Sequence, residues 1–225
     1  MKSHRGDTMR HKFEAQLQEL KKKIVEMSVL VEKALEQAME SLKNRDMALA
    51  EKVISDDGQI NDSEQDIELL CTHLVATQQP FASDLRNIVA SYKIISSLER
   101  MGDLSVDIAK VSLRIGPDPL IKPLIDMPKM AEIAVQMMRT AVQAFICEDV
   151  ELARSLAETD HKVDHYYKLI FNELNEMMAK DSAISGQAVY LLLATRYIER
   201  IGDYCTNIGE EVIYMQLGVR ENLNK

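Results

Sequence analysis

The sequence predicts an all-α protein made of two tandem three-helix bundles, with six long helices in all. Glycine and proline, which interrupt helices, number only 8 and 5 among 225 residues. Leu, Ala, Met, Glu, Lys and Gln recur throughout the chain, and all of them are good helix formers. The chain also repeats its own pattern after roughly 100 residues, which indicates a duplicated unit. Amphipathic helices of this kind bury their apolar stripes against one another.

Three helices are expected in the first half. An apolar-periodic stretch covers about residues 9–43. Asp46 then offers a carboxylate to cap a second helix, which reaches about Thr77. Pro80 has no N–H group and disfavours the helical conformation of the residue before it. The third helix is therefore expected over about residues 82–115.

Three more helices are expected after a proline-rich linker. Four of the five prolines fall in "GPDPLIKPLIDMPKM", which is the one credible domain boundary. Helical periodicity resumes over about residues 129–147, and Asp149 is placed to cap the fifth helix. Asp181 or Ser182 is expected to cap the sixth, which ends near Gly218.

The two halves match position by position. Asp57 corresponds to Asp160, and "LERMGDLSVDI" at 98–108 aligns with "IERIGDYCTNI" at 198–208. A duplicated helix triplet is the simplest explanation of this correspondence. The two repeats are therefore placed at residues 9–116 and 124–218.

The matched segments carry ladders of acidic residues. Positions four apart on a helix lie on one face, so Glu99, Asp103 and Asp107 form a single stripe. Apolar residues occupy roughly the opposite side, so the stripe is expected at a bundle edge, outside the deep core. Like charges at this spacing repel one another, and basic neighbours or a bound cation would offset the repulsion. The second copy of the ladder holds Glu199, Asp203 and Asn207.

The preceding helix of each half supplies further oxygen donors. Asp57 and Asn61 lie on one helical face, and Asp160 and Asp164 repeat them. Facing ladders on two helices of a bundle would form a carboxylate-rich groove, and hard or borderline metal ions favour carboxylate oxygens. Basic neighbours remain the alternative explanation in the first half, whereas Glu210 adds negative charge in the second.

Charge and cysteine content narrow the functional classes. The formal net charge is −9, with 27 basic and 36 acidic residues, and no basic cluster favours nucleic-acid binding. Cys71, Cys147 and Cys205 are isolated, which indicates a reducing cytoplasm and thiols that pack as small apolar core residues. The chain has no run of about 18 apolar residues, so no membrane span is predicted. No G-x-S-x-G motif or P-loop occurs either.

Two alternatives to a surface metal site stay open. A carboxylate-bridged di-metal oxidoreductase of the ferritin-like kind needs two Glu-x-x-His motifs that point inward. The chain has one, from Glu158 to His161, and His161 and His165 are expected to be exposed. A helical scaffold without metal predicts the same fold as the metal-binding protein.

At these motifs the chain resembles the PhoU family of phosphate-uptake regulators. The segments "LERMGDLSVDIA" and "IERIGDYCTNIG" are similar to the family's two E-x-x-x-D signatures, and "FEAQLQELKKKIVEM" and the "DLR" of 84–86 extend the likeness. The resemblance implies bundles related by pseudo-twofold symmetry, with multinuclear surface sites for iron or zinc. The implied ligands are Glu99, Asp103, Asp107, Glu199, Asp203 and the weaker donor Asn207, with Asp57, Asp160 and Asp164 as additions.

The resemblance also implies a regulatory, non-catalytic role. Such proteins restrain phosphate uptake and phosphate-starvation signalling, acting with the phosphate-specific ABC transporter and a membrane sensor histidine kinase. The expected protein is cytoplasmic, reaches the membrane only through these partners, and has a homodimer as one expected assembly. Tyr204 stands where the second signature often has histidine, so the two sites are not expected to be fully equivalent.

Overall fold

Helices make up nearly all of this computed structural model, which describes the backbone of residues 3–224 and the side chains of residues 13–224. The prediction of an all-α fold is confirmed, because no strand occurs in the described part of the chain. The helices are α1 (Ser3–Asn44), α2 (Met47–Asp56), α3 (Gly58–Gln78), α4 (Ala82–Ile115), α5 (Asp126–Cys147), α6 (Val150–Lys180), the short 3₁₀ helix η1 (Ser182–Ile184) and α7 (Ser185–Leu217).

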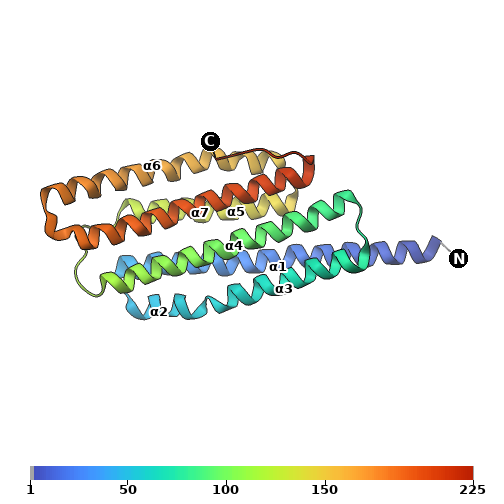
Figure 1. Ribbon diagram of the computed structural model, residues 1–225, viewed down its shortest axis with the longest axis horizontal. Helices are drawn as coiled ribbons and strands as arrows, with labels where there is room; N and C mark the ends of the chain where they lie inside the picture. The colour runs from blue at the N-terminus through green and yellow to red at the C-terminus, as the bar shows by residue number, and fades with distance from the viewer. Residues whose placement is uncertain (1–2, 225) are drawn as a thin grey trace.

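The helices form two bundles that pack against each other along their length (Figure 1). Helices α1, α2, α3 and α4 make the first bundle, and α5, α6 and α7 make the second. Helix α4 packs along α7, and α1 packs on α5, so these four helices lie in the middle. Helix α6 lies on one outer side, and α2 and α3 lie on the other.

Two of the predicted capping residues, Asp46 and Asp149, act as expected. The carboxylate of Asp46 accepts the N–H of Leu49 at 2.9 Å, and Asp149 accepts the N–H of Leu152 at 3.0 Å. Asp181 was one of two candidates to cap the sixth long helix, but it caps η1, and α7 begins at Ser185 without a side-chain cap. These side chains satisfy N–H groups that a helix cannot pair internally. The sequence thus fixes where α2, α6 and η1 begin.

Three helix boundaries differ from the prediction. The second predicted helix is divided into two helices, since α2 ends at Asp56 and α3 begins at Gly58. Glycine weakens a helix at this point. Helix α5 begins three residues early, since Pro128 falls in the first turn, where no N–H donor is needed. Helix α1 begins at Ser3 instead of residue 9.

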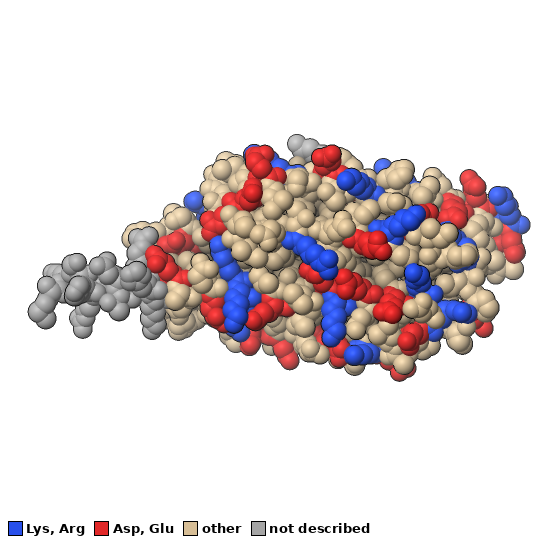
Figure 2. All heavy atoms as spheres, turned by 180° about the vertical axis from the view of Figure 1, so that it is seen from behind, with Lys and Arg blue, Asp and Glu red and all other residues tan. Residues whose placement is uncertain are grey.

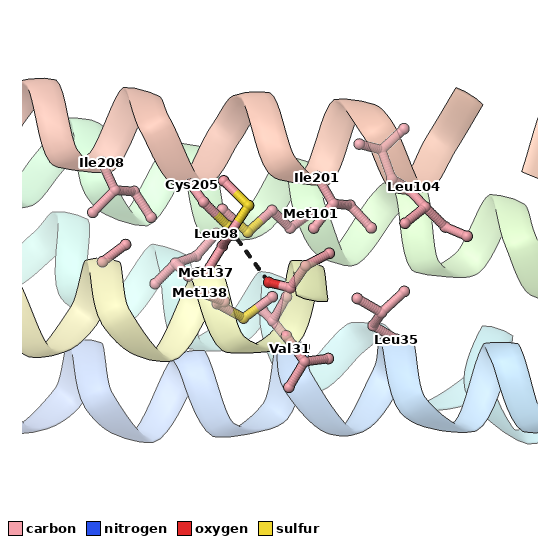
Figure 3. Close-up of a cluster of buried hydrophobic side chains, with 14 of the residues drawn as sticks. Val31, Leu35, Leu98, Met101, Leu104, Met137, Met138, Ile201, Cys205 and Ile208 are labelled. Carbon is pink, nitrogen blue, oxygen red and sulfur yellow. Dashed lines mark hydrogen bonds between the residues drawn. The ribbon is translucent and has the colours of Figure 1, made fainter. Parts of the chain in front are cut away.

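The apolar core fills the space between the four central helices (Figure 3). Met101 from α4 and Ile201 from α7 are fully buried and occupy matched positions of the two repeats. Met137 and Met138 come from α5, and Val31 comes from α1. The core is therefore shared by both bundles, so the packing of each one depends on the other.

The three cysteines follow the prediction in two cases. Cys71 and Cys205 are buried, and burial raises the pKa of the Cys71 thiol to about 12. The Cys205 thiol donates to the Ala134 carbonyl at 3.9 Å, as the dashed line in Figure 3 shows. The expectation is wrong for Cys147, which is exposed because it is the last residue of α5 and lies outside the core.

The surface carries both charge signs in close mixture. Figure 2 shows Lys and Arg interspersed with Asp and Glu over the face opposite to that of Figure 1, without a broad basic area. Opposite charges also link the bundles, since Arg139 of α5 donates to Glu32 at 2.8 Å and to Glu36 at 3.2 Å. Within the described residues, no helix has the length and apolar character required to cross a membrane.

Two acidic faces as candidate metal centres

The first acidic face lies where α4 meets the junction of α2 and α3. It comprises Asp57, Asn61, Glu64, Glu99, Asp103 and Asp107, and none of these residues is buried in the core. The side chain of Glu99 is 18% exposed and that of Asp103 is 45% exposed. The predicted position at a bundle edge is therefore confirmed for this face.

The acids of the first face influence one another. Burial raises the pKa of Asp57, the hydrogen bond from Asn61 Nδ2 at 3.1 Å lowers it, and the charge of Asp103 raises it further. Burial also raises the pKa of Glu99, and Asp103 and Glu64 add to that effect. Side chains from both helices thus share one electrostatic environment.

The second acidic face lies between α6 and α7 and comprises Asp160, Asp164, Glu199, Asp203 and Asn207. Burial, followed by the charges of Asp164 and Asp203, raises the pKa of Asp160 to about 6. Burial and the charge of Asp203 raise the pKa of Glu199 to about 7. Asp160, on the facing helix, lies deeper than the other acids and is only 8% exposed.

A glycine precedes the central aspartate in both repeats, but different side chains fill the space beside it. A Cβ atom at Gly202 would lie 3.0 Å from Asp160 Oδ1, so the missing side chain makes room for the carboxylate. A Cβ atom at Gly102 would instead meet the Ile60 side chain at 3.0 Å. Both glycines permit close helix approach beside the acids, as helical glycines do. In the first repeat the space holds an apolar group, and in the second it holds an acid.

The basic neighbours that the sequence offered pair with three acids of the first face. Arg100 lies 3.4 Å from both Glu99 and Asp103, and Lys110 lies 3.0 Å from Asp107. These exposed pairs contribute little net stability. Asp107 is therefore held by Lys110 at the end of the stripe.

The second face departs from this arrangement. Among the described residues Arg200 forms no ion pair with Asp203, and its Nη2 atom lies 3.5 Å from Tyr204 Oη. Arg196, which the sequence analysis missed, pairs with Glu199. The i,i+3 spacing of Arg196 and Glu199 was the available signal. Asn207 lies one turn beyond Asp203, half-buried on α7.

Within the described residues, each acidic face has one buried carboxylate oxygen without a hydrogen-bond partner. These atoms are Asp57 Oδ1 and Glu199 Oε2, and a third such oxygen, Glu211 Oε2, lies on α7 outside both faces. A buried polar atom without a partner loses its hydration without compensation. A cation would satisfy such an oxygen, and carboxylates are the donors that hard and borderline metals take. The residues present therefore fit a metal ion chemically.

The acids approach one another without converging on one point. Within the described residues, no group of three or more His, Cys, Asp or Glu side chains is arranged to hold an ion. Ligation would therefore require side-chain rotation about χ angles, which half-exposed carboxylates on helices can undergo.

The Glu-x-x-His motif, on which the oxidoreductase alternative depends, does not face the bundle interior. Glu158 and His161 of the single Glu-x-x-His motif are exposed on α6, and so is His165. A ferritin-like di-metal centre requires these side chains to point into a bundle core. The prediction of exposed histidines is confirmed.

Fold and faces together define a class: duplicated helical-bundle proteins in which each half presents a carboxylate-rich face. A family model described as PhoU domain matches residues 24–112 and residues 127–212. The chain is 36% identical over 213 residues to the phosphate-specific transport system accessory protein PhoU homolog of Clostridium acetobutylicum, covering 94% of this chain and 97% of that protein. The chain belongs to the PhoU family.

Other relatives agree with this assignment. The homolog of the same description from Aquifex aeolicus is 37% identical over 203 residues, covering 90% of this chain and 92% of that one. The crystal structure of PhoU from Pseudomonas aeruginosa has a TM-score of 0.87 at 33% identity, covering 92% of this chain and 100% of that one. The phosphate transport system regulatory protein PhoU from Streptococcus pneumoniae also gives 0.87, at 30% identity over 93% of this chain and 99% of that one.

Proposed function

We propose that this chain is a non-catalytic regulator of phosphate uptake and phosphate-starvation signalling. The observation that carries the proposal is the match, over nearly the whole chain, to proteins described as accessory or regulatory components of phosphate transport. The regulator would act in the cytoplasm by binding the phosphate-specific ABC transporter and a sensor histidine kinase. A homodimer is the proposed assembly, and the two repeats at 9–116 and 124–218 are its proposed structural units.

We further propose that both acidic faces bind metal ions, with iron or zinc as the candidates. The first face would use Asp57, Glu99, Asp103 and Asp107. A bound cation would supply positive charge beside carboxylates that burial keeps from full hydration. Support comes from the buried carboxylate oxygen without a partner at each acidic face, Asp57 Oδ1 and Glu199 Oε2. The second face would use Asp160, Asp164, Glu199, Asp203 and Asn207.

Complementation tests the regulatory role. A bacterial strain that lacks its own PhoU-family gene is supplied with this chain, and phosphate uptake and a phosphate-starvation reporter are measured at high phosphate. Restored repression is the expected result. Repression that stays absent, although the chain is folded and abundant, would contradict the regulatory role. Co-purification with the transporter and the sensor kinase from detergent extracts tests the two partners separately.

Metal analysis tests the two faces. The chain is purified without chelator, and iron and zinc are measured by mass spectrometry in wild type, in Asp103→Asn and in Asp203→Asn. Each variant should lose the metal of one face and retain that of the other. Wild type without metal would favour the scaffold alternative, and O₂-dependent turnover of Fe(II) would favour the oxidoreductase.

A further inference from the structure

The last described residues, 218–224, fold back after α7 ends and run along the second bundle (Figure 1). We call this segment the C-terminal strap. The chain reverses at Gly218, whose φ of 71° is a left-handed conformation that glycine adopts without steric cost. From there the strap leads back toward the second acidic face.

Ion pairs hold the first part of the strap. Arg220 Nη1 donates to Glu211 Oε1 at 2.7 Å, and its guanidinium lies 4.2 Å from the centre of the Tyr214 ring. Both oxygens of Glu221 accept from Arg154 of α6, at 3.0 and 2.5 Å. Such a two-point arrangement fixes orientation as well as position. The strap is thus tied to both helices that border the second acidic face.

The middle of the strap is held by a backbone hydrogen bond and an apolar contact. The N–H of Leu223 donates to Glu210 Oε1 at 2.9 Å. Its side chain lies against Gly209, where an added Cβ atom would meet Leu223 Cδ1 at 3.1 Å. Glu210, which looked like excess negative charge in the sequence, therefore anchors the strap.

The end of the strap reaches a predicted metal ligand. The hydroxyl of Thr206, which also donates to the backbone carbonyl of Asp203 at 2.7 Å, contacts the side-chain oxygen of Asn224. This contact turns the amide nitrogen of Asn224 toward Asp203, with Nδ2 3.5 Å from Oδ1. The strap thus presents the side-chain N–H of Asn224 to an Asp203 oxygen that a cation would also use.

The repeats differ where the strap binds. The matched residues of α4 cannot make the same contacts, because Lys110 carries the wrong charge, and Val106 and Val111 have no polar side-chain atom.

The Arg154 anchor on α6 is also missing from the first repeat, where Glu51 occupies the matched position. The nearby Asp203 and Ile208 match Asp103 and Ile108 unchanged. The α7 contact residues Thr206, Gly209, Glu210 and Glu211 thus replace Val106, Ala109, Lys110 and Val111.

We propose that the C-terminal strap competes with a cation for the second acidic face, so that a cation bound at Asp203 releases the strap. The inference rests on the proposed function of this face as a metal site. An N–H donor and a cation that approach the same oxygen, Asp203 Oδ1, repel each other, because both direct positive charge toward it. Coupling between two binding events is reciprocal. If a bound cation weakens the attachment of the strap by a given factor, loss of that attachment must strengthen cation binding by the same factor.

A pair of matched variants tests the competition. Glu221 and Glu151 both pair with Arg154, but only Glu221 belongs to the strap. Zn²⁺ alone is titrated by calorimetry into the full chain carrying Asp103→Asn, which leaves the second face intact. Adding Glu221→Gln should tighten Zn²⁺ binding by roughly threefold, as an exposed charge pair allows, and Glu151→Gln should leave it unchanged. Unchanged or weaker binding by Glu221→Gln would overturn the competition.

Hydrogen exchange gives a second measurement. Zn²⁺ should speed exchange of the Leu223 amide, because that N–H is protected by the contact with Glu210. Slower or unchanged exchange in the Zn²⁺-bound chain would overturn the proposal and leave the metal site standing. If wild type binds no Zn²⁺ at either face, the proposed metal sites fail, and the competition fails with them.

Discussion

The two repeats place the same acids at matched helical positions, yet the second face is more deeply buried. Asp160 is 8% exposed, whereas the matched Asp57 is only half-buried. Across the helix contact, the larger Ile60 fills the space beside Gly102, and the smaller Val163 leaves room beside Gly202 for the Asp160 carboxylate. The packing of one apolar neighbour, more than the number of acids, therefore decides how far each face is removed from water.

The core shared by the two repeats should respond equally on both sides. Met101 and Ile201 are both fully buried at matched positions. Each change to alanine should lower the free energy of unfolding by about 2–5 kcal/mol, because it removes buried methylene groups and leaves a cavity. Urea unfolding of the two variants measures this. A cost below about 1 kcal/mol for one of them would show that its bundle relaxes independently.

The deeper burial of the second face predicts a pH dependence in metal-free protein. The pKa of Glu199 is raised from 4.5 to about 7, so over this window the native state holds a proton that the unfolded state has lost. Native stability therefore falls as pH rises from about 4.5 to about 7, and Asp160 adds to the slope. Above pH 7, Glu199→Gln should be more stable than wild type by on the order of 1 kcal/mol.

The matched change on the first face is the control. Glu99→Gln should stabilise less than Glu199→Gln, because the Glu99 side chain is more exposed. Urea midpoints are compared at pH 5 and pH 8 in the presence of chelator. An equal gain for both variants would contradict the difference in burial between the faces.

Gly209 and Ala109 test the strap contact at matched positions. A Cβ atom at Gly209 would lie 2.8 Å from Leu156 Cδ1 and 3.1 Å from the Ala153 carbonyl oxygen. Gly209→Ala should therefore cost about 1–3 kcal/mol through overpacking and speed amide exchange in the strap. Ala109→Gly should cost about 0.5–1 kcal/mol through helix propensity and leave strap exchange unchanged. Equal strap exchange in both variants would contradict the contact.

Local signals in the sequence predicted most of the fold. Asp46 and Asp149 identified helix starts because capping depends on neighbouring residues alone. The acid ladders and the core stripes followed from helical periodicity, which determines the face of each side chain. The location of both acidic faces was predictable for the same reason.

Features that depend on packing between helices were not predictable. The burial of Asp160 depends on the size of Val163 and on the absence of a side chain at Gly202, which meet only in the folded bundle. The strap has no periodicity, so residues 218–224 gave no helical signal. A retrospective signal exists in Glu210, because a charge that breaks the match with Lys110 calls for a partner elsewhere in the chain.

The break between α2 and α3 is the smallest difference between the repeats. Helix α6 is continuous through His161, whereas the matched Gly58 begins a new helix. Apart from its chain neighbours and its own helix backbone, nothing lies within 4 Å of a Cβ built on Gly58, and its φ is not in the left-handed region. Gly58→Ala should therefore raise the free energy of unfolding by about 0.5–1 kcal/mol, because alanine loses less backbone entropy on folding.

The reciprocal variant His161→Gly should lower stability by a similar amount, since it puts glycine into a continuous helix. Urea midpoints measure both changes, and hydrogen exchange of the Ile60 amide, which donates to the Asp57 carbonyl at 2.9 Å, reports on the junction itself. Slower exchange in Gly58→Ala would show that glycine alone weakens the helix there. A loss of stability in Gly58→Ala would instead mean that the break is imposed by the packing of α2 and α3 on α4.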